Sequence, residues 1–288
     1  MPQVTVVMAT YNWATVLPYS IASVLDQTFT DFELLVIGDG CTDESGIVVN
    51  SIEDPRVHWC DLTPRTGHQS GPNNEGIRRA QGEVIAYLGH DDLWLPRHLS
   101  VLVKAIDAGA SFTFGSALMI VPGQEPSPWP PAGWAYTPGE WIPPTTVAHD
   151  RALVEAVGGW RRPQETGAFE SESELWMRMA AQSGPPKGSA ELTCLKLPAA
   201  RRRDVYRQRP HDEQEYWLGR LRDGDDLNRE YRRPSRRSEG LIRSIRSHIR
   251  VRTRLRQLGV LAQLPEPATE SGEERWRAAS RFKGVDDS

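Results

Sequence analysis

Apolar residues follow two alternating patterns over the first 120 or so positions of the chain. Continuous apolar runs with few polar interruptions are typical of strands that are buried on both faces of a sheet, and they predict five strands. These strands are 3–9, 32–37, 56–60, 84–88 and 110–121. Between them, apolar residues with helical spacing predict helices over 16–25, 74–80 and 96–106, the last with Pro96 in its first turn.

The alternation of strands and helices determines the expected fold. Elements repeat about every 30 residues, which indicates right-handed βαβ units. We therefore predict an α/β fold with a mainly parallel, Rossmann-like sheet that is flanked by helices. The carboxyl ends of parallel strands meet at one edge of such a sheet, and open α/β sheets bind their ligands there.

The pattern changes after residue 122. Residues 122–144 are rich in proline, glycine and tryptophan, which predicts an irregular loop that carries Trp129, Trp134 and Trp141. These rings either present aromatic faces to a ligand or anchor the loop on the core. Further on, the sequence predicts a strand at 145–148, helices at 151–157 and 169–180, and a strand at 191–197.

Composition places the chain among ordinary soluble proteins. It has 288 residues, 39% hydrophobic and 25% charged, with a net charge of −4 and only three scattered cysteines. No stretch reaches the roughly 20 apolar residues that span a bilayer, and no signal peptide is evident, so we expect a cytoplasmic protein. The cysteine pattern argues against disulfides and structural zinc. We expect no nucleic-acid partner.

The charge is unevenly distributed. Residues 240–264 contain six arginines and no acidic residue, with leucine and isoleucine at helical spacing. This pattern predicts a basic amphipathic helix within a helical extension over 208–264. It would bind an anionic membrane at the inner face or pack on the preceding α/β domain or a second subunit, which leaves a homodimer open. We expect the polar tail, 265–288, to be disordered.

Polar residues follow three of the predicted strands directly. Thr10 and Tyr11 follow the first strand, Asp39 lies in a glycine-flanked turn after the second, and His90 and Asp91 follow strand 84–88. Side chains from three strand ends would converge on one crevice, as in a nucleotide pocket. The chain lacks a GxGxxG motif and a P-loop, so a divalent metal held by carboxylates would meet the phosphate charge.

Asp92 has a second interpretation. An aspartate in a strand-to-helix turn commonly caps the helix that follows it, and Asp92 is placed to do so.

Three segments resemble the nucleotide-binding half of the GT-A glycosyltransferases of family 2. They are VTVVMATYN, SVLDQTFTDFELLVIGDGCTD and QGEVIAYLGHDDLWLPRHL. The resemblance is close over 3–122 and looser to about 207. It implies a GT-A catalytic domain over 1–207, with a nucleotide-sugar half at 1–122 and an acceptor half at 123–207.

The resemblance also implies an activity and roles for residues. A sugar would pass, with inversion, from a nucleoside diphosphate to a hydroxyl of a glycan or lipid-linked acceptor in polysaccharide biosynthesis. Asp91 would hold Mn²⁺ or Mg²⁺, and Glu172, with Glu170 in reserve, would be the general base. The nucleotide-binding set would be Thr10, Tyr11, Asp39, Asn73 and His90.

The chain departs from the family pattern at three positions. Gly89 stands where the family usually has an acidic residue, Gly38 replaces a frequent aspartate, and Asn73 replaces an arginine. Two alternatives to a transferase stay open. One is a catalytically silent module that binds sugar nucleotides or docks on a membrane, and the other is a sugar-phosphate nucleotidyltransferase.

Overall fold

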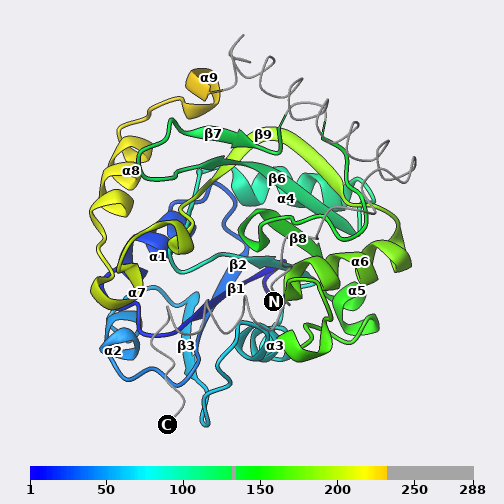
Figure 1. Ribbon diagram of the computed structural model, residues 1–288, viewed down its shortest axis with the longest axis horizontal. Coiled ribbons are helices and arrows are strands. Elements are labelled where there is room, and N and C mark those ends of the chain that lie inside the picture. The colour runs from blue at the N-terminus through cyan, green and yellow to red at the C-terminus, as the bar shows by residue number, and fades with distance from the viewer. Residues whose placement is uncertain (132–133, 232–288) are drawn as a thin grey trace, which may run out of the picture.

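The computed structural model describes residues 1–131 and 134–231, which form an α/β structure with helices on both faces of one sheet (Figure 1). The first half contains β1 (Val4–Thr10), α1 (Leu17–Leu25), β2 (Phe32–Gly38), α2 (Ser45–Asn50), β3 (Val57–Asp61), α3 (Ser70–Arg79), β4 (Val84–Tyr87), β5 (Leu93–Trp94), α4 (His98–Asp107) and β6 (Phe112–Met119). The second half contains β7 (Ser127–Trp129), β8 (Val147–Asp150), α5 (Arg151–Ala156), α6 (Ser171–Ser183), β9 (Lys187–Lys196), α7 (Val205–Gln208), α8 (Asp212–Arg222) and α9 (Leu227–Tyr231). Short 3₁₀ turns lie at Pro144–Thr146, Pro163–Glu165 and Ala199–Arg201.

The sheet is parallel in its first half and mixed in its second. Its strand order is β3-β2-β1-β4-β8-β6-β9-β5, with β7 added beside β6. The four strands from β3 to β4 are parallel, as predicted. Beyond β4, β8 runs antiparallel to both of its neighbours, while β6 and β9 are parallel to each other. The predicted α/β class is therefore confirmed, with a mixed sheet.

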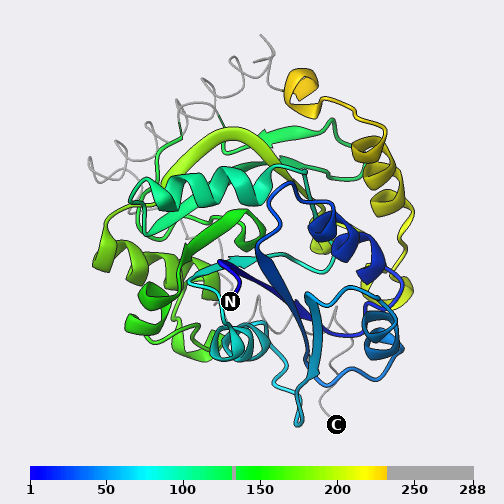
Figure 2. The same cartoon turned by 180° about the vertical axis from the view of Figure 1, so that it is seen from behind.

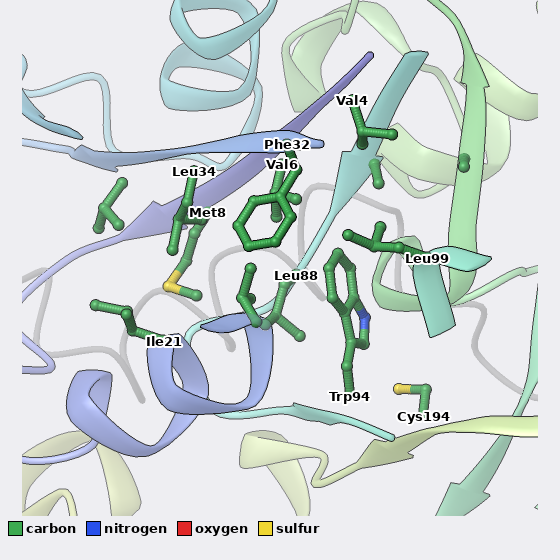
Figure 3. Close-up of a cluster of buried hydrophobic side chains, with 14 of the residues drawn as sticks. Val4, Val6, Met8, Ile21, Phe32, Leu34, Leu88, Trp94, Leu99 and Cys194 are labelled. Atoms are coloured by element: carbon green, nitrogen blue, oxygen red, sulfur yellow. The ribbon is translucent and has the colours of Figure 1, made fainter. Parts of the chain in front are cut away.

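The central strands are apolar throughout because both of their faces are covered. Val4, Val6 and Met8 of β1 point toward one face, where α1, α2 and α4 pack (Figure 3). Val7 points the other way, toward α3, α5 and α6. Seen from behind, the helices of the first face lie in front of the sheet (Figure 2). This two-sided burial holds the carboxyl ends of β1, β2 and β4 in fixed positions.

The connection after β4 differs from the expected strand-to-helix turn. Two residues, Leu93 and Trp94, form the short strand β5, which pairs antiparallel with β9. Helix α4 starts only at His98, and its N-cap residue, Arg97, makes no side-chain cap hydrogen bond. The interpretation of Asp92 as a helix cap is therefore wrong.

The loop at 122–144 also contains more structure than expected. Residues 127–129 form β7, because they pair with the end of β6, beyond the three residues that pair with β8. Trp129 and Trp134 pack against Phe114 of β6, at ring-centroid distances of 5.8 and 5.6 Å, so these two rings anchor the loop. Trp141 stays partly exposed, at 36%.

The C-terminal part of the chain is described only through α9. Helix α8 lies against α1 at the edge of the molecule, and Trp217 and Leu218 pack with the apolar side chains of β9 (Figure 1). The predicted amphipathic helix at 240–264 and the tail at 265–288 lie outside the described residues. Within residues 1–131 and 134–231, no helix is long and apolar enough to cross a membrane.

Two core histidines should make the fold sensitive to acid. Burial lowers the pKa of His98 to about 3 and that of His149 to about 4, from an ordinary 6.5. Below pH 6.5 the unfolded chain takes up protons that the folded chain cannot, so the stability that these groups contribute at neutral pH is lost as the pH falls. We expect the free energy of unfolding, measured by urea titration, to fall by about 1 kcal/mol per histidine between roughly pH 7.5 and roughly pH 5.5.

The exposed His58 provides the matched control. His149→Gln should flatten this pH dependence, and His58→Gln should leave it as it is. A pH dependence that is the same in wild type and His149→Gln would contradict the assignment.

Candidate active site

The carboxyl ends of β1 and β2 lie side by side and bring Tyr11 next to Asp39. Thr10 pairs with Gly38 in the parallel register. The backbone N–H of Asp39 then donates to the carbonyl of Thr10 at 2.9 Å, which carries the pairing one residue past β2. The structure therefore places these predicted nucleotide-binding residues in one site.

Asp39 orients the loop that follows β3. Its carboxylate accepts hydrogen bonds from the backbone N–H groups of Thr66 and Gly67, both at 2.8 Å, and from the Thr66 hydroxyl at 2.6 Å. The guanidinium of Arg65 lies over the ring of Tyr11, with its Cζ 3.5 Å from the ring centre. Asp39 thus acts on the site partly by holding this loop in place.

The structure explains why glycine occupies position 38. A Cβ added to Gly38 would lie 2.3 Å from Asp61 Oδ1 and 2.7 Å from the ring of Trp59. Asp61 Oδ1 accepts hydrogen bonds from the backbone N–H groups of Gly40 and Cys41, at 2.9 and 3.1 Å. The carboxylate of Asp61 therefore organises this turn from the neighbouring strand and takes the space of a side chain at position 38.

His90 is fixed against the end of β1. Its Nδ1 lies 3.0 Å from the carbonyl oxygen of Ala9, and its ring stacks on Trp13 with 4.4 Å between centroids. Its own carbonyl accepts a hydrogen bond from the Ser20 hydroxyl at 2.7 Å. These contacts hold the turn that carries Asp91 beside the Thr10–Tyr11 segment.

The two adjacent aspartates have different environments. The carboxylate of Asp92 is completely buried, where it pairs with Lys196 Nζ at 2.8 Å and accepts the Leu197 N–H at 2.9 Å. Burial alone would lower the pKa of Lys196, but Asp92 and Asp91 raise it above its ordinary value, so the ammonium stays charged. Asp92 is therefore a structural anchor between the β4 turn and the end of β9.

Asp91 is the carboxylate of this turn that is left for a ligand. It is 6% exposed, and its backbone carbonyl accepts a hydrogen bond from Gln214 of α8 at 3.0 Å. A side chain at position 89 would crowd both aspartates, because a Cβ there would lie 2.7 Å from Asp92 Oδ2 and 3.2 Å from Asp91 Oδ1. The turn therefore presents one carboxylate where the family pattern usually has two.

This donor set fits one kind of metal site. Among residues 1–131 and 134–231, no cluster of three or more histidine, cysteine and acidic side chains could hold a metal by itself. Mg²⁺, however, is usually bound by one or two carboxylates together with substrate phosphates and water. Asp91 therefore fits a divalent ion that is bound jointly with a diphosphate.

Glu172 is held at the start of α6 by two side chains. Its Oε1 accepts a hydrogen bond from Trp141 Nε1 at 3.0 Å, and its Oε2 accepts one from Gln69 Nε2 at 2.7 Å. Burial raises its pKa above the ordinary value. Glu170, by contrast, is exposed at the N-cap of α6 and makes no side-chain cap hydrogen bond. This geometry favours Glu172 over Glu170 as a proton acceptor.

One short loop, residues 65–70, connects the two parts of the site. Arg65, Thr66 and Gly67 contact Tyr11 and Asp39, and Gln69 contacts Glu172. Asn73 follows in the first turn of α3, buried at 4% exposure. In the described part of the chain, no hydrogen bond joins the Asn73 side chain to the other predicted site residues.

Sequence reasoning missed Arg65, Gln69 and Lys196. Arg65 and Gln69 lie in a segment with no motif, and Lys196 meets Asp92 across 104 positions of sequence. The tryptophans of the 122–144 loop did carry a signal, and Trp141 is the one that reaches Glu172. Phe169, 44% exposed, lies close to Gly139 of the same loop, which gives the neighbourhood of Glu172 two exposed aromatic rings.

Residues 5–154 match the sequence profile of Glycosyl transferase family 2, which is more than half of the chain. A GalNAc(5)-diNAcBac-PP-undecaprenol beta-1,3-glucosyltransferase from Campylobacter jejuni is 31% identical over 124 residues, 41% of this chain and 39% of that protein. The Escherichia coli UDP-Glc:alpha-D-GlcNAc-diphosphoundecaprenol beta-1,3-glucosyltransferase WfgD is 31% identical over 114 residues, 39% of this chain and 45% of that protein. The matched segment thus spans less than half of either relative.

Solved structures share the fold. TarS 1–349 of S. aureus in complex with UDP-GlcNAc superposes with a TM-score of 0.56 at 16% identity, covering 79% of this chain and 68% of that one. The mannosyltransferase PcManGT from Pyrobaculum calidifontis, in complex with GDP-Man and Mn²⁺, gives a TM-score of 0.53 at 19% identity, covering 78% of this chain and 65% of that one. At these identities the likeness concerns the fold.

Proposed function

Because this chain belongs to glycosyl transferase family 2, we propose that it transfers a hexose from a nucleoside diphosphate donor to a hydroxyl of a glycan or lipid-linked acceptor. The observation that carries this proposal is the convergence at one sheet edge. Tyr11 and Asp39 meet after β1 and β2, the turn with Asp91 lies beside them, and Glu172 joins them through the 65–70 loop. A base-binding surface, a carboxylate for the diphosphate and a proton acceptor are the parts that such a transfer requires.

The chain's own residues account for most of the proposed chemistry. Tyr11, Asp39 and the 65–70 loop would bind and orient the nucleotide. Glu172 would take the proton of the acceptor hydroxyl as the new C–O bond forms, because a neutral hydroxyl is a weak nucleophile. Trp141 and Gln69 would hold both oxygens of that carboxylate and so fix the direction of attack.

Attack by one hydroxyl opposite the leaving diphosphate would invert the anomeric carbon. Glu172 would then act as base and not as nucleophile, and its raised pKa suits that role.

Asp91 would hold the divalent ion, Mn²⁺ or Mg²⁺, together with the donor diphosphate. The bound ion would offset negative charge on the departing diphosphate. Because no cluster of three ligating side chains exists among the described residues, the ion would bind together with the nucleotide. The Mn²⁺ in the PcManGT complex supports metal use on this fold.

The acceptor side is proposed from the aromatic rings near Glu172. Trp141 and Phe169 are two of the few large hydrophobic side chains that are exposed in the described part of the chain. Exposed aromatic surface beside a polar site commonly marks a ligand-binding face. The relatives named above act on undecaprenol-linked sugars, which supports a lipid-linked acceptor. This chain would then work at the inner face of a membrane.

Turnover of nucleotide sugars tests the proposal. The full chain, incubated with UDP-, GDP-, CDP- or dTDP-hexoses and Mg²⁺ or Mn²⁺, should release the nucleoside diphosphate from one donor class, with a rate that drops on addition of EDTA. A protein that binds one of these nucleotides but releases no diphosphate with any polyprenyl-linked or free sugar acceptor would instead be a silent binding module. Release of pyrophosphate from a nucleoside triphosphate and a sugar phosphate would indicate a nucleotidyltransferase.

A further inference from the structure

The face of Tyr11 is covered by an arginine from the loop after β3. The Cζ of Arg65 lies 3.5 Å from the centre of the Tyr11 ring, which is direct stacking contact. Its Nε lies 3.9 Å from Asp39 Oδ2, and its side chain is 30% exposed. Arg65 therefore sits between two side chains that the proposed function assigns to the nucleotide.

The loop backbone fixes the position of Arg65 beside the Tyr11 ring and the Asp39 carboxylate. The next two residues, Thr66 and Gly67, donate hydrogen bonds to Asp39. Gly40, with φ +72°, passes so close that a Cβ there would lie 2.9 Å from the Cβ of Arg65. Arg65 thus has a defined position in the site and differs in this from a mobile surface arginine.

Two buried polar atoms in this part of the molecule make no hydrogen bond within residues 1–131 and 134–231. They are the Nε of Arg65 and the hydroxyl oxygen of Thr10. A buried donor that lacks a partner costs free energy, and a ligand that binds beside it can supply the missing partner.

The chain contains a matched arginine whose donors are satisfied. Arg56 stacks on Phe32 with its Cζ 4.4 Å from the ring centre. Its Nε and one terminal nitrogen donate to Asp54 at 3.0 and 2.8 Å. Arg56 and Arg65 thus both stack on an aromatic ring. Among the described residues, the Nε of Arg56 donates a hydrogen bond and the Nε of Arg65 does not.

We propose that Arg65 is a nucleotide-binding residue that recognises the base of the donor. The base takes the face of Tyr11 that the guanidinium covers, and the guanidinium moves outward by one ring thickness. In that position the guanidinium stacks on the base or donates its Nε–H to an acceptor atom at the edge of the base. This inference rests on the proposed function, since it assumes that a nucleotide base binds between Tyr11 and Arg65.

Equilibrium binding tests the proposal without a need for turnover. The full chain is titrated by calorimetry with UDP, GDP, CDP and dTDP in the presence of Mg²⁺, and the tightest nucleotide is then used for Arg65→Ala, Arg65→Lys and Arg56→Ala. Loss of a charged hydrogen bond and a stacking contact should weaken binding about tenfold or more in Arg65→Ala. Arg65→Lys should recover little, because an ammonium has no flat face and no fixed fork of donors. Arg56→Ala should bind like wild type.

Inorganic pyrophosphate separates recognition of the base from attraction to the phosphates. Its affinity should be the same in wild type and Arg65→Ala, and thermal unfolding should show that the variants are folded. Unchanged or tighter nucleotide binding in Arg65→Ala, or an equal loss for pyrophosphate, would overturn the proposal and leave the proposed function standing. If wild type binds none of the four nucleotides, the proposed function fails and this inference fails with it.

Discussion

Replacement of Glu172 by glutamine should lower the turnover number for sugar transfer by about a hundredfold to ten-thousandfold, which is the usual contribution of a positioned general base. The amide keeps the size of the side chain and can still contact Trp141 and Gln69, but it cannot take a proton. The Michaelis constant for the donor should change little, because the nucleotide is bound elsewhere. Initial rates measured with the donor and acceptor pair on which the wild type is active would check both numbers.

Glu170→Gln provides the matched control for this experiment. Glu170 lies two residues away and is exposed, so its loss should leave the turnover number within about twofold of wild type. The wild-type rate should also fall in acid, below a pKa that burial places above the ordinary glutamate value. If Glu170→Gln were the inactive variant and Glu172→Gln the active one, the assignment of the base would be reversed.

Asp91→Asn should lower the turnover number to about one-hundredth of the wild-type value or less. It should also remove the stimulation by Mn²⁺ or Mg²⁺. Asp91 is the carboxylate of its turn that is left for a ligand, since Asp92 is taken up by Lys196 and Leu197. A neutral amide is a poor ligand for a hard cation, so the charge on the leaving diphosphate would be uncompensated. Nucleotide binding with and without metal, measured by calorimetry beside the rate, separates a lost metal site from a misfolded one.

Asp107→Asn is a suitable control for Asp91→Asn. Asp107 accepts a hydrogen bond from Gln3, just before β1, and so lies at the sheet edge opposite the site. It should retain wild-type rates and metal response. Full metal stimulation in Asp91→Asn would show that the ion binds elsewhere or is not used.

The strands that could be predicted are those whose burial on both faces is evident from the local sequence. The runs at 3–9, 32–37 and 84–88 are apolar at nearly every position because helices cover both faces of the sheet there, and β1, β2 and β4 follow them closely. Their carboxyl ends also carry the predicted polar residues. Local pattern was therefore sufficient for these three strands.

The remaining strands of the sheet depend on pairings between distant segments, which no local pattern encodes. Strand β8 inserts antiparallel between β4 and β6, and β5 consists of two residues that are strand only because β9 lies beside them. The role of Asp92 depends in the same way on Lys196. These features follow from tertiary contacts, so sequence reasoning gave a simple turn and a more parallel sheet in their place.

The candidate site shows the same division. Tyr11, Asp39 and Asp91 could be proposed from their positions after strands. Arg65 could not, because its contact with Tyr11 depends on the path of a loop that the carboxylate of Asp39 holds. The crowding that a side chain at position 89 would cause likewise became evident only from the positions of both aspartate side chains.

The central claim is that one edge of the sheet binds the nucleoside diphosphate of a sugar donor. A crystal structure of the full chain with the tightest-binding nucleoside diphosphate and Mn²⁺ tests it most directly. The account predicts a base on Tyr11 beside Asp39, with the anomalous signal of Mn²⁺ between the diphosphate and Asp91. A nucleotide bound at any other surface, with Tyr11, Asp39 and Asp91 untouched, would contradict it.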